Sequence, residues 1–166
     1  MLSLAEPADA ADWSLARALI EDYSAALGVD LSFQDFASEL AALATVYGPP
    51  AGALLLARLD GQPAGCVALR ALQPGIAELK RLYVAPTARG AGVGRALAAA
   101  MLERARALDY ARVRLDTLPN MSEAQALYRS LGFRPIAAYR FNPVPGTAYF
   151  ERVLVGDADA ERKLPV

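Results

Sequence analysis

The chain has 166 residues, 55% of them hydrophobic, and its 17 basic and 18 acidic residues give a formal net charge of −1. A chain of this length can bury a sizeable core as one domain, and a charge near zero creates no overall field that would gather nucleic acid or an anionic membrane. One cysteine excludes an internal disulfide, and the lack of histidine excludes histidine bases, histidine-activated nucleophiles and the usual catalytic zinc sites.

The first 50 residues predict a short strand followed by two helices. Residues 2–6 suit an edge strand, apolar residues then recur at helical spacing over 13–27, and Gly28 can end that helix. Ser32 can cap a second helix, which Gly48-Pro49-Pro50 would stop. No apolar run approaches the ~18 residues of a membrane span, and the N-terminus lacks the basic region and apolar core of a secretory signal. We therefore expect a cytoplasmic protein without membrane contact.

The middle of the chain predicts an antiparallel meander of three strands. Segments 53–58 and 64–70 flank Asp60-Gly61, a dipeptide typical of a tight hairpin turn. A third strand over 76–84 follows the turn Gln73-Pro74-Gly75.

The remaining segments complete a mixed α/β pattern. A helix over about 92–108 and a strand over 112–116 follow the third strand, which predicts a right-handed parallel crossover. A helix over 122–130 and strands over 133–139 and 147–154 come next. No repeat, linker or composition break divides the chain. We expect one domain over residues 1–166, with its core at about 2–155 and a polar tail at 156–166.

The run Arg89-Gly90-Ala91-Gly92-Val93-Gly94 predicts an anion site between a strand and a helix. Alternate glycines allow a tight turn that brings bare N–H groups to an anion, and the helix start adds the positive end of its dipole. Arg89 and Arg95 add charge at the rim. The spacing fits neither a Walker A loop nor a dinucleotide fingerprint. A glycine-rich turn without a ligand is the alternative.

Four blocks make the chain similar to the GNAT superfamily of acyl-CoA-dependent N-acyltransferases. They are the strand Glu78-Leu79-Lys80-Arg81-Leu82-Tyr83-Val84, the glycine run with its helix, Asn120, and Ala126-Leu127-Tyr128-Arg129-Ser130-Leu131-Gly132-Phe133. This resemblance implies an α/β (α+β) fold, with a mixed, mostly antiparallel sheet splayed at a coenzyme A cleft and helices on both faces. It also implies an N-acetyltransferase that uses acetyl-CoA and acts by direct attack in a ternary complex.

Within the resemblance, backbone and side-chain groups bind the cofactor. The glycine run would hold the pyrophosphate, and the strand backbone would pair with the pantetheine arm. Asn120 would add an amide contact, although a Pro119-Asn120 turn explains it equally well. Leu82 and Val84 can also be simple core residues. The expected cofactor-binding residues are Leu82, Tyr83, Val84, Arg89, Gly90, Ala91, Gly92, Val93, Gly94, Arg95, Asn120 and Tyr128.

Glu78 is the expected general base, since a glutamate at this place serves so in some family members. Strand alternation would put it on one face with Lys80, Leu82 and Val84. The alternative is a surface glutamate paired with Lys80 or Arg81.

Tyr128 matches the family's tyrosine beside the leaving thiolate, and a phenol with an ordinary pKa of about 10 stays protonated at pH 7. The alternative is a helix tyrosine that packs on Leu131 and Phe133. Cys66 lies in an apolar strand without an activating neighbour, so we expect an inert buried thiol.

The expected acceptor is the amine of a small molecule or peptide, and the candidate substrate-binding residues are Tyr23, Phe33, Arg81, Arg140 and Asn142. Arg81 and Arg140 could hold an acceptor's carboxylate, or both could be solvated surface residues. A non-catalytic acyl-CoA sensor or an interaction module that dimerises through its last strands is the alternative function. The sequence names neither the acceptor nor the acyl length.

Overall fold

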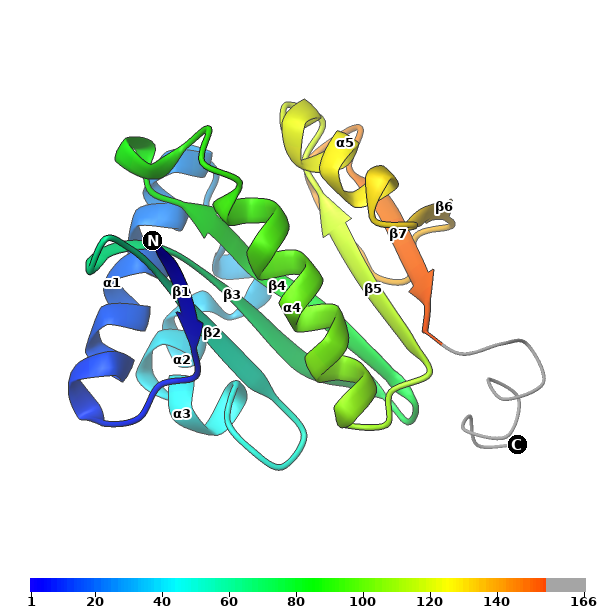
Figure 1. Ribbon diagram of the computed structural model, residues 1–166. Helices are drawn as coiled ribbons and strands as arrows, with labels where there is room; N and C mark the ends of the chain where they lie inside the picture. Colours follow the sequence, from blue (N-terminus) through cyan, green and yellow to red (C-terminus); the bar gives the residue numbers. More distant parts are fainter. Residues whose placement is uncertain (155–166) are drawn as a thin grey trace. The chain divides into compact units, whose positions relative to one another are not determined.

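The computed structural model describes residues 1–154, and the expected polar tail at 156–166 lies outside this part. Its strands form a seven-stranded, mostly antiparallel sheet in the order β1-β2-β3-β4-β5-β7-β6 (Figure 1). The strands are β1 (Leu2–Ala5), β2 (Ala53–Leu59), β3 (Gln62–Gln73), β4 (Ile76–Val84), β5 (Arg112–Thr117), β6 (Arg134–Ile136) and β7 (Ala148–Val153). The expected mixed α/β fold is confirmed.

The described residues divide into two compact units. The first unit comprises residues 1–70 and 79–104, and the second comprises residues 71–78 and 105–154. The helices are α1 (Ala10–Leu27), α2 (Phe36–Ala41), α3 (Leu43–Val46), α4 (Val93–Ala107) and α5 (Ser122–Ser130), with short 3-10 turns η1 (Ser32–Gln34) and η2 (Pro86–Ala88). The expectation of one domain over 1–166 stays a prediction.

Helix α1 confirms the first predicted helix and has a defined cap at each end. The carboxylate of Asp9 accepts a hydrogen bond of 2.9 Å from the backbone N–H of Asp12, which satisfies one of the free donors of the first turn. Gly28 ends the helix in the left-handed conformation, with φ +65°. Ala16, Leu19 and Ile20 form its buried face, as the helical spacing predicts.

The second predicted helix is wrong as one continuous element. The segment is divided into η1, α2 and α3 because Asp35 adopts a left-handed conformation with φ +56°, and Ala42 leaves the helical region with φ −133°. Ser32 does not cap a helix through its side chain; it begins the 3-10 turn instead. Apolar spacing alone could not locate these two interruptions, since the apolar residues stay in phase across them.

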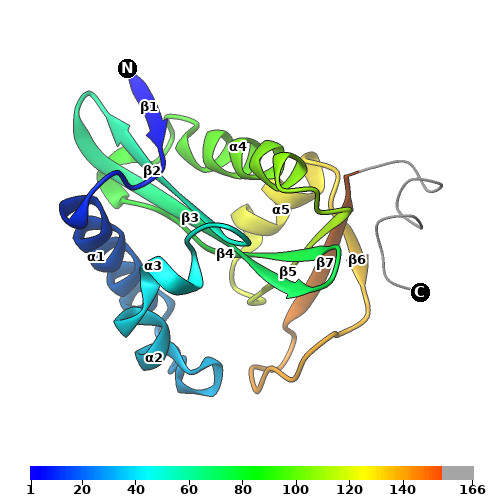
Figure 2. The same cartoon turned by 90° about the horizontal axis from the view of Figure 1, so that it is seen from below.

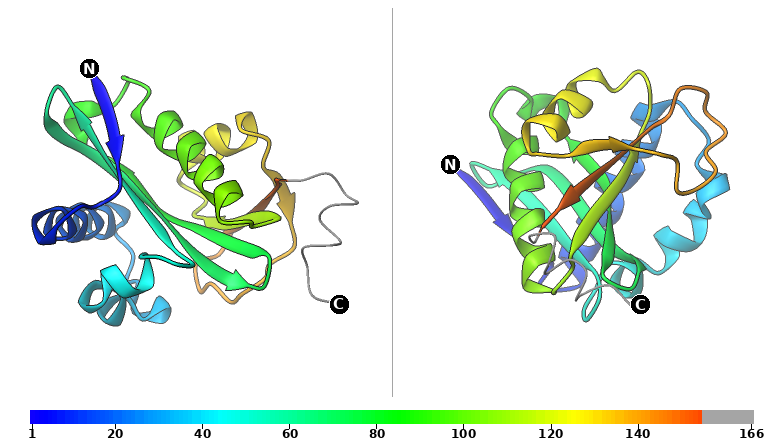
Figure 3. Two further views of the ribbon diagram at one scale, coloured as in Figure 1. Left: turned by 60° about the horizontal axis from the view of Figure 1, so that its bottom comes forward. Right: turned by 90° about the vertical axis from the view of Figure 1, so that its right-hand side faces the viewer.

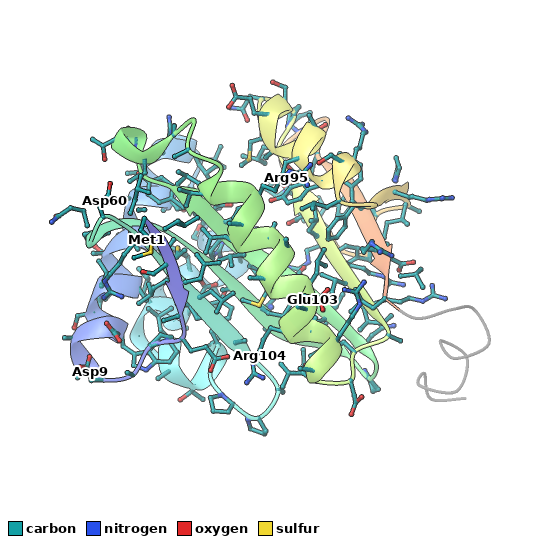
Figure 4. The ribbon with its side chains drawn as sticks, viewed as in Figure 1. Met1, Asp9, Asp60, Arg95, Glu103 and Arg104 are labelled. Carbon is teal, nitrogen blue, oxygen red and sulfur yellow. The ribbon has the colours of Figure 1, made fainter. Side chains whose placement is uncertain are left out.

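The predicted hairpin between β2 and β3 is confirmed. The two strands pair antiparallel, and Asp60 and Gly61 both have positive φ, 51° and 81°, as a type I′ turn requires. Strand β1 pairs antiparallel with β2, with Leu2 opposite Leu59. The amino group of Met1 also binds the carboxylate of Asp60 at the end of this hairpin (Figure 4).

Helices cover both faces of the strands in the first unit (Figures 2 and 3). On one face, α1 and α3 pack with alternate residues of β2 and β3, including Leu54, Leu56, Cys66 and Ala68. Helix α4 lies on the other face, where a Cβ at Gly65 would come within 3.3 Å of the side chain of Leu97. That Cβ would also lie 2.3 Å from the carbonyl oxygen of Tyr83. Only glycine therefore permits the backbone at this position to approach the backbone of Tyr83 so closely.

In the second unit, the beginning of β4 pairs with β5 in parallel, with Glu78 opposite Arg114. The predicted parallel connection from β4 through α4 to β5 is therefore confirmed. Strand β7 pairs antiparallel with both β5 and β6. Strand β6 is shorter than the predicted 133–139, because the chain after Ile136 leaves the ladder and runs without regular structure up to β7. Across residues 1–154, no helix has the length and apolar character needed to cross a membrane.

Candidate functional site

The glycine run forms an exposed loop that leads directly into α4. Gly90 and Gly92 both have positive φ, 84° and 77°, which side-chain-bearing residues adopt only with strain. No atom lies within 4 Å of where their Cβ atoms would be, so the glycines serve the backbone path and not tight packing. Val93, by contrast, is buried and fixes the start of the helix.

This loop offers backbone donors and positive charge to an anion. The first N–H groups of a helix have no intrahelical acceptor, and they carry the positive end of the helix dipole. Arg95 lies in the first turn of α4 (Figure 4). Arg89 is exposed and its Nε donates to the carbonyl oxygen of Val84 at 3.3 Å, which links the loop to the end of β4. The arrangement suits phosphate groups bound mainly by main-chain N–H groups.

Strand β4 contains a bulge at Arg81. This non-glycine residue has φ +59°, and the neighbouring side chains of Lys80 and Arg81 both reach the Oε1 of Gln34, at 3.0 and 2.9 Å. Two consecutive strand residues point to one side only where the alternation of the strand is interrupted.

The bulge corrects one sequence-based expectation. Because alternation restarts at Arg81, Tyr83 follows Arg81 onto the side of α1 and α3, where it packs against their apolar cluster. Alternation from Arg81 and Tyr83 then puts Leu82 and Val84 on the opposite side from Lys80. The expected common face of Glu78, Lys80, Leu82 and Val84 is therefore wrong. The backbone roles of Leu82, Tyr83 and Val84 toward pantetheine stay predictions.

Arg81 forms a buried ion pair with Glu39. Its Nε and Nη2 donate to the two carboxylate oxygens of Glu39, each at 2.8 Å, and the side chains are only 2% and 5% exposed. The guanidinium also lies 5.6 Å from the ring centre of Tyr23 and 5.2 Å from that of Phe36. Arg81 is therefore no solvated surface residue, and an acceptor's carboxylate would have to displace Glu39 to bind it.

The pair is electrostatically coupled. Burial alone would raise the pKa of Glu39, but the hydrogen bonds and charge of Arg81 outweigh it and hold that pKa below its ordinary value. Burial alone would lower the pKa of Arg81, but Glu39 raises it overall. Sequence reasoning missed Glu39. The sequence did contain a signal for it. Glu39 lies three residues after Phe36 and four before Leu43, so helical spacing puts its carboxylate on the same side as these apolar residues.

Glu78 lies at the centre of a polar cluster in the second unit. Its Oε2 accepts a 2.7 Å hydrogen bond from the hydroxyl of Tyr139 and lies 2.5 Å from Nη2 of Arg140. The side chain of Glu78 is 1% exposed, so the alternative of a surface glutamate is wrong. The partnership with Tyr139 could not be found from sequence, because 61 residues separate the two.

The irregular segment 137–147 carries the partners of Glu78. Burial, followed by the charge of Glu78, raises the pKa of Tyr139 above its ordinary value, so its hydroxyl is a stable donor. The Arg140 guanidinium lies 5.4 Å from the ring centre of Tyr139, and the hydroxyl of Tyr149 donates to the Arg140 carbonyl oxygen at 2.8 Å. Asn142 donates to Asp116 at 3.3 Å.

Tyr128 and Asn120 also belong to the second unit. Tyr128 is 5% exposed on α5 and contacts Phe133 edge-on, with ring centres 5.6 Å apart. It therefore packs on Phe133, as expected for a helix tyrosine with a structural role. Asn120 is exposed in a turn after β5. The backbone N–H of Met121 closes this turn by donating to the Leu118 carbonyl oxygen at 3.1 Å, which agrees with the alternative of a Pro119-Asn120 turn. Neither observation tests a role toward the cofactor, and both roles stay predictions.

The candidate acceptor residues fall into separate groups. Tyr23 contacts Arg81 in the first unit, whereas Arg140 and Asn142 join the Glu78 cluster in the second. Phe33 lies in η1, and its side chain falls outside the described part. Cys66 is fully buried and its Sγ donates to the Arg81 carbonyl oxygen at 3.4 Å. Burial raises the pKa of this thiol to about 12, which fits the expected inert cysteine.

Comparisons with known proteins agree with this architecture. The model of the acetyltransferase (GNAT) family matches residues 14–133. An uncharacterized N-acetyltransferase of Schizosaccharomyces pombe is 39% identical over 145 residues, which covers 86% of this chain and 87% of that protein. N-acetylaspartate synthetase of Rattus norvegicus is 38% identical over 99 residues, covering 59% of this chain and only 33% of that protein.

Solved structures share the fold. The yncA protein of Salmonella typhimurium, solved with its cofactor acetyl-CoA, is 18% identical, with a TM-score of 0.68 over 94% of this chain and 95% of that chain. The family model covers most of the strands and helices described above, including the glycine loop and Tyr128. The chain belongs to the GNAT family of acetyltransferases.

Proposed function

We propose that this protein transfers an acetyl group from acetyl-CoA to the primary amine of a small molecule or peptide, by direct attack in a ternary complex. The observation that carries the proposal is the exposed loop with positive-φ Gly90 and Gly92 at the start of α4, in a chain of the acetyltransferase family. The names of related proteins support the reaction class: an N-acetyltransferase and an N-acetylaspartate synthetase.

The residues described fit the loop's proposed ligand. Main-chain N–H groups of the loop and the α4 dipole would hold the pyrophosphate of coenzyme A, with Arg89 and Arg95 at its edge. The backbone of Leu82, Tyr83 and Val84 would pair with the pantetheine arm, and Asn120 would add an amide contact. Bound acetyl-CoA supplies a thioester whose carbonyl carbon accepts the amine.

Each proton has a proposed path. Glu78 takes one proton from the acceptor's ammonium group, and the nitrogen lone pair then forms a bond to the thioester carbon. The C–S bond breaks, and its electron pair leaves on sulfur. Tyr128 gives its hydroxyl proton to the thiolate and is reprotonated from the nitrogen's second proton through solvent. The net products are an N-acetyl amide, the free thiol and one released proton.

A first prediction concerns the loop glycines. Gly92→Val should weaken acetyl-CoA binding by about tenfold or more, because a side chain would occupy the space left open beside the loop and would strain its positive φ. Isothermal titration with acetyl-CoA measures this. Gly61→Val is the matched control: Gly61 also has positive φ, 81°, and no atom within 4 Å of its Cβ position. Equal affinity losses in the two variants would contradict the assignment of the loop.

A second prediction concerns Tyr128. Tyr128→Phe should lower kcat by about 10²-fold, as removal of a general acid typically does. The measurement is thiol release from acetyl-CoA with a panel of amines. Tyr110→Phe is the control, since Tyr110 is also buried in the second unit and its removed hydroxyl has no proposed role. An unchanged kcat in Tyr128→Phe would remove Tyr128 from the mechanism.

The same panel separates the enzyme from a non-catalytic sensor. An enzyme releases thiol with at least one amine and forms the corresponding amide. Tight binding of acetyl-CoA without thiol release from any amine would contradict the proposal and favour the sensor.

A further inference from the structure

The ion pair between Glu78 and Arg140 has one fixed end and one movable end. Glu78 belongs to β4, and its backbone is held in the parallel ladder opposite Arg114. Its Oε2 is also held by the hydroxyl of Tyr139. Arg140 belongs to the irregular segment between β6 and β7. Its side chain is 20% exposed, compared with 1% for Glu78. The guanidinium therefore covers the buried carboxylate from the solvent side.

The backbone of Arg140 is anchored even though its side chain is partly exposed. The hydroxyl of Tyr149 donates to its carbonyl oxygen, and Tyr149 packs edge-on against Tyr139 with ring centres 5.3 Å apart. Rotation about the side-chain bonds of Arg140 can thus move the guanidinium away from Glu78 without moving the chain. Tyr139 would keep its hydrogen bond to Glu78 during this motion.

Two other charged residues of the second unit, Arg114 and Asp116, have partners of their own. Arg114 lies 5.8 Å from the ring centre of Tyr139, but its Nε donates to Glu151 at 2.7 Å. Asp116 accepts from Asn142. A ligand that displaces Arg140 from Glu78 therefore has to offer a negative charge to the guanidinium, or it removes the carboxylate that Arg140 binds here.

We infer that the Glu78–Arg140 pair recognises the zwitterionic head of a free α-amino acid acceptor, an inference that rests on the proposed function. The acceptor's ammonium group replaces Arg140 at Glu78, and its α-carboxylate binds the released guanidinium. Two ion pairs then replace the single pair of Glu78 and Arg140. The ammonium and carboxylate groups of an α-amino acid are close together, which suits binding to two side chains that are in contact before the ligand arrives.

The exchange also selects the nucleophile. A simple amine can take the place of Arg140 at Glu78, but it leaves the guanidinium without a carboxylate. A peptide N-terminus has the same defect, since its neighbouring carbonyl is an uncharged amide. Arg140 is thus a specificity-determining residue, and free amino acids are the preferred acceptor class. Glu78, now in contact with the ammonium group, takes its proton as the proposed function requires.

The test compares matched acceptors. Each standard L-amino acid is paired with the amine that lacks its α-carboxylate, and kcat/KM is measured for both by thiol release. In the wild-type protein the best amino acid should exceed its amine by about 30-fold or more, as expected for a charge pair made in a partly buried site. Arg140→Gln should abolish this preference, mainly through KM, and Arg140→Lys should retain part of it. Arg114→Gln, which alters another arginine against Tyr139, should keep the preference.

Opposite results would overturn the inference: no wild-type preference, or the same preference in Arg140→Gln. If no acceptor releases thiol, the proposed function fails, and calorimetric titration with the amino acids decides the inference separately. The inference is supported if an amino acid binds the wild-type protein and this binding is lost in Arg140→Gln. It is overturned if no amino acid binds the wild-type protein. If Arg140→Gln does not fold, the titration uses the double variant that carries both Glu78→Gln and Arg140→Gln. This double variant removes both charges of the pair together.

Discussion

Glu78→Gln is expected to lower kcat for amine acetylation by about 10²–10⁴-fold, the usual contribution of a general base. Glutamine has the shape of glutamate, and its amide oxygen can still accept from Tyr139 and Arg140, which hold Oε2 of Glu78 at 2.7 and 2.5 Å. The substitution therefore removes the proton acceptor and keeps much of the surrounding geometry. Steady-state thiol release measures kcat, and thermal unfolding verifies that the variant is folded.

Glu151→Gln provides the matched control for this result. Glu151 is another carboxylate of the second unit that binds arginines, Arg112 at 3.1 Å and Arg114 at 2.7 Å, and it has no role in the proposed reaction. It should retain wild-type kcat. An unchanged kcat in Glu78→Gln would remove Glu78 from the mechanism, and an equal fall in both variants would show that Glu78 acts only through structure.

The buried pair of Glu39 and Arg81 should give the largest effect on stability. Glu39→Gln is expected to lower the free energy of unfolding by about 3–5 kcal/mol, because the charge of Arg81 would stay buried without a counter-charge. This is a large part of the roughly 5–15 kcal/mol that stabilises a typical domain. Urea unfolding at pH 7 measures the loss. Adding Arg81→Met to Glu39→Gln should restore part of it, since no buried charge then remains.

The same pair predicts the direction of the pH dependence. The pKa of Glu39 is lower in the folded protein than in the unfolded chain, where a glutamate titrates near 4.5. The contribution of Glu39 to the free energy of unfolding is therefore complete above pH 4.5. It is lost as the pH falls through the lower pKa of the folded protein. The wild-type protein should lose stability between about pH 5 and 3 more steeply than Glu39→Gln.

Glu21→Gln is the control for both measurements. Glu21 accepts from Arg17 at 2.8 Å, but both side chains are about half exposed. An exposed pair of this kind contributes about 0–1 kcal/mol. If Glu39→Gln were no more destabilising than Glu21→Gln, the buried pair would not hold the helix segment to β4.

Much of the fold could be predicted because the local signals were strong. Asp60-Gly61 predicted the hairpin turn that the structure contains, and Gly28 predicted the end of α1. The segment 76–84 and the glycines after it predicted a strand, loop and helix in the correct order. In each case a residue type with a special backbone preference stands where the chain needs it.

The errors lie where the local sequence gives no signal. The bulge at Arg81 follows no glycine or proline signal, and the side chain that occupies it binds Glu39, 42 residues earlier. Breaks at Asp35 and Ala42 likewise interrupt an apolar pattern that continues in phase. Sequence alone singled out Glu78 and Arg140, but it could not show that they contact each other, because β4 and segment 137–147 meet only in the folded chain.

The most direct test of the central claim is transfer of a labelled acetyl group. The protein is incubated with acetyl-CoA carrying a deuterated acetyl group and a mixture of amino acids and amines, and the products are analysed by mass spectrometry. We predict a deuterated acetyl group on the nitrogen of at least one acceptor, with an equal amount of free coenzyme A and with product formation about 10²–10⁴-fold slower in Glu78→Gln. Bound acetyl-CoA that stays intact with every acceptor would contradict the account.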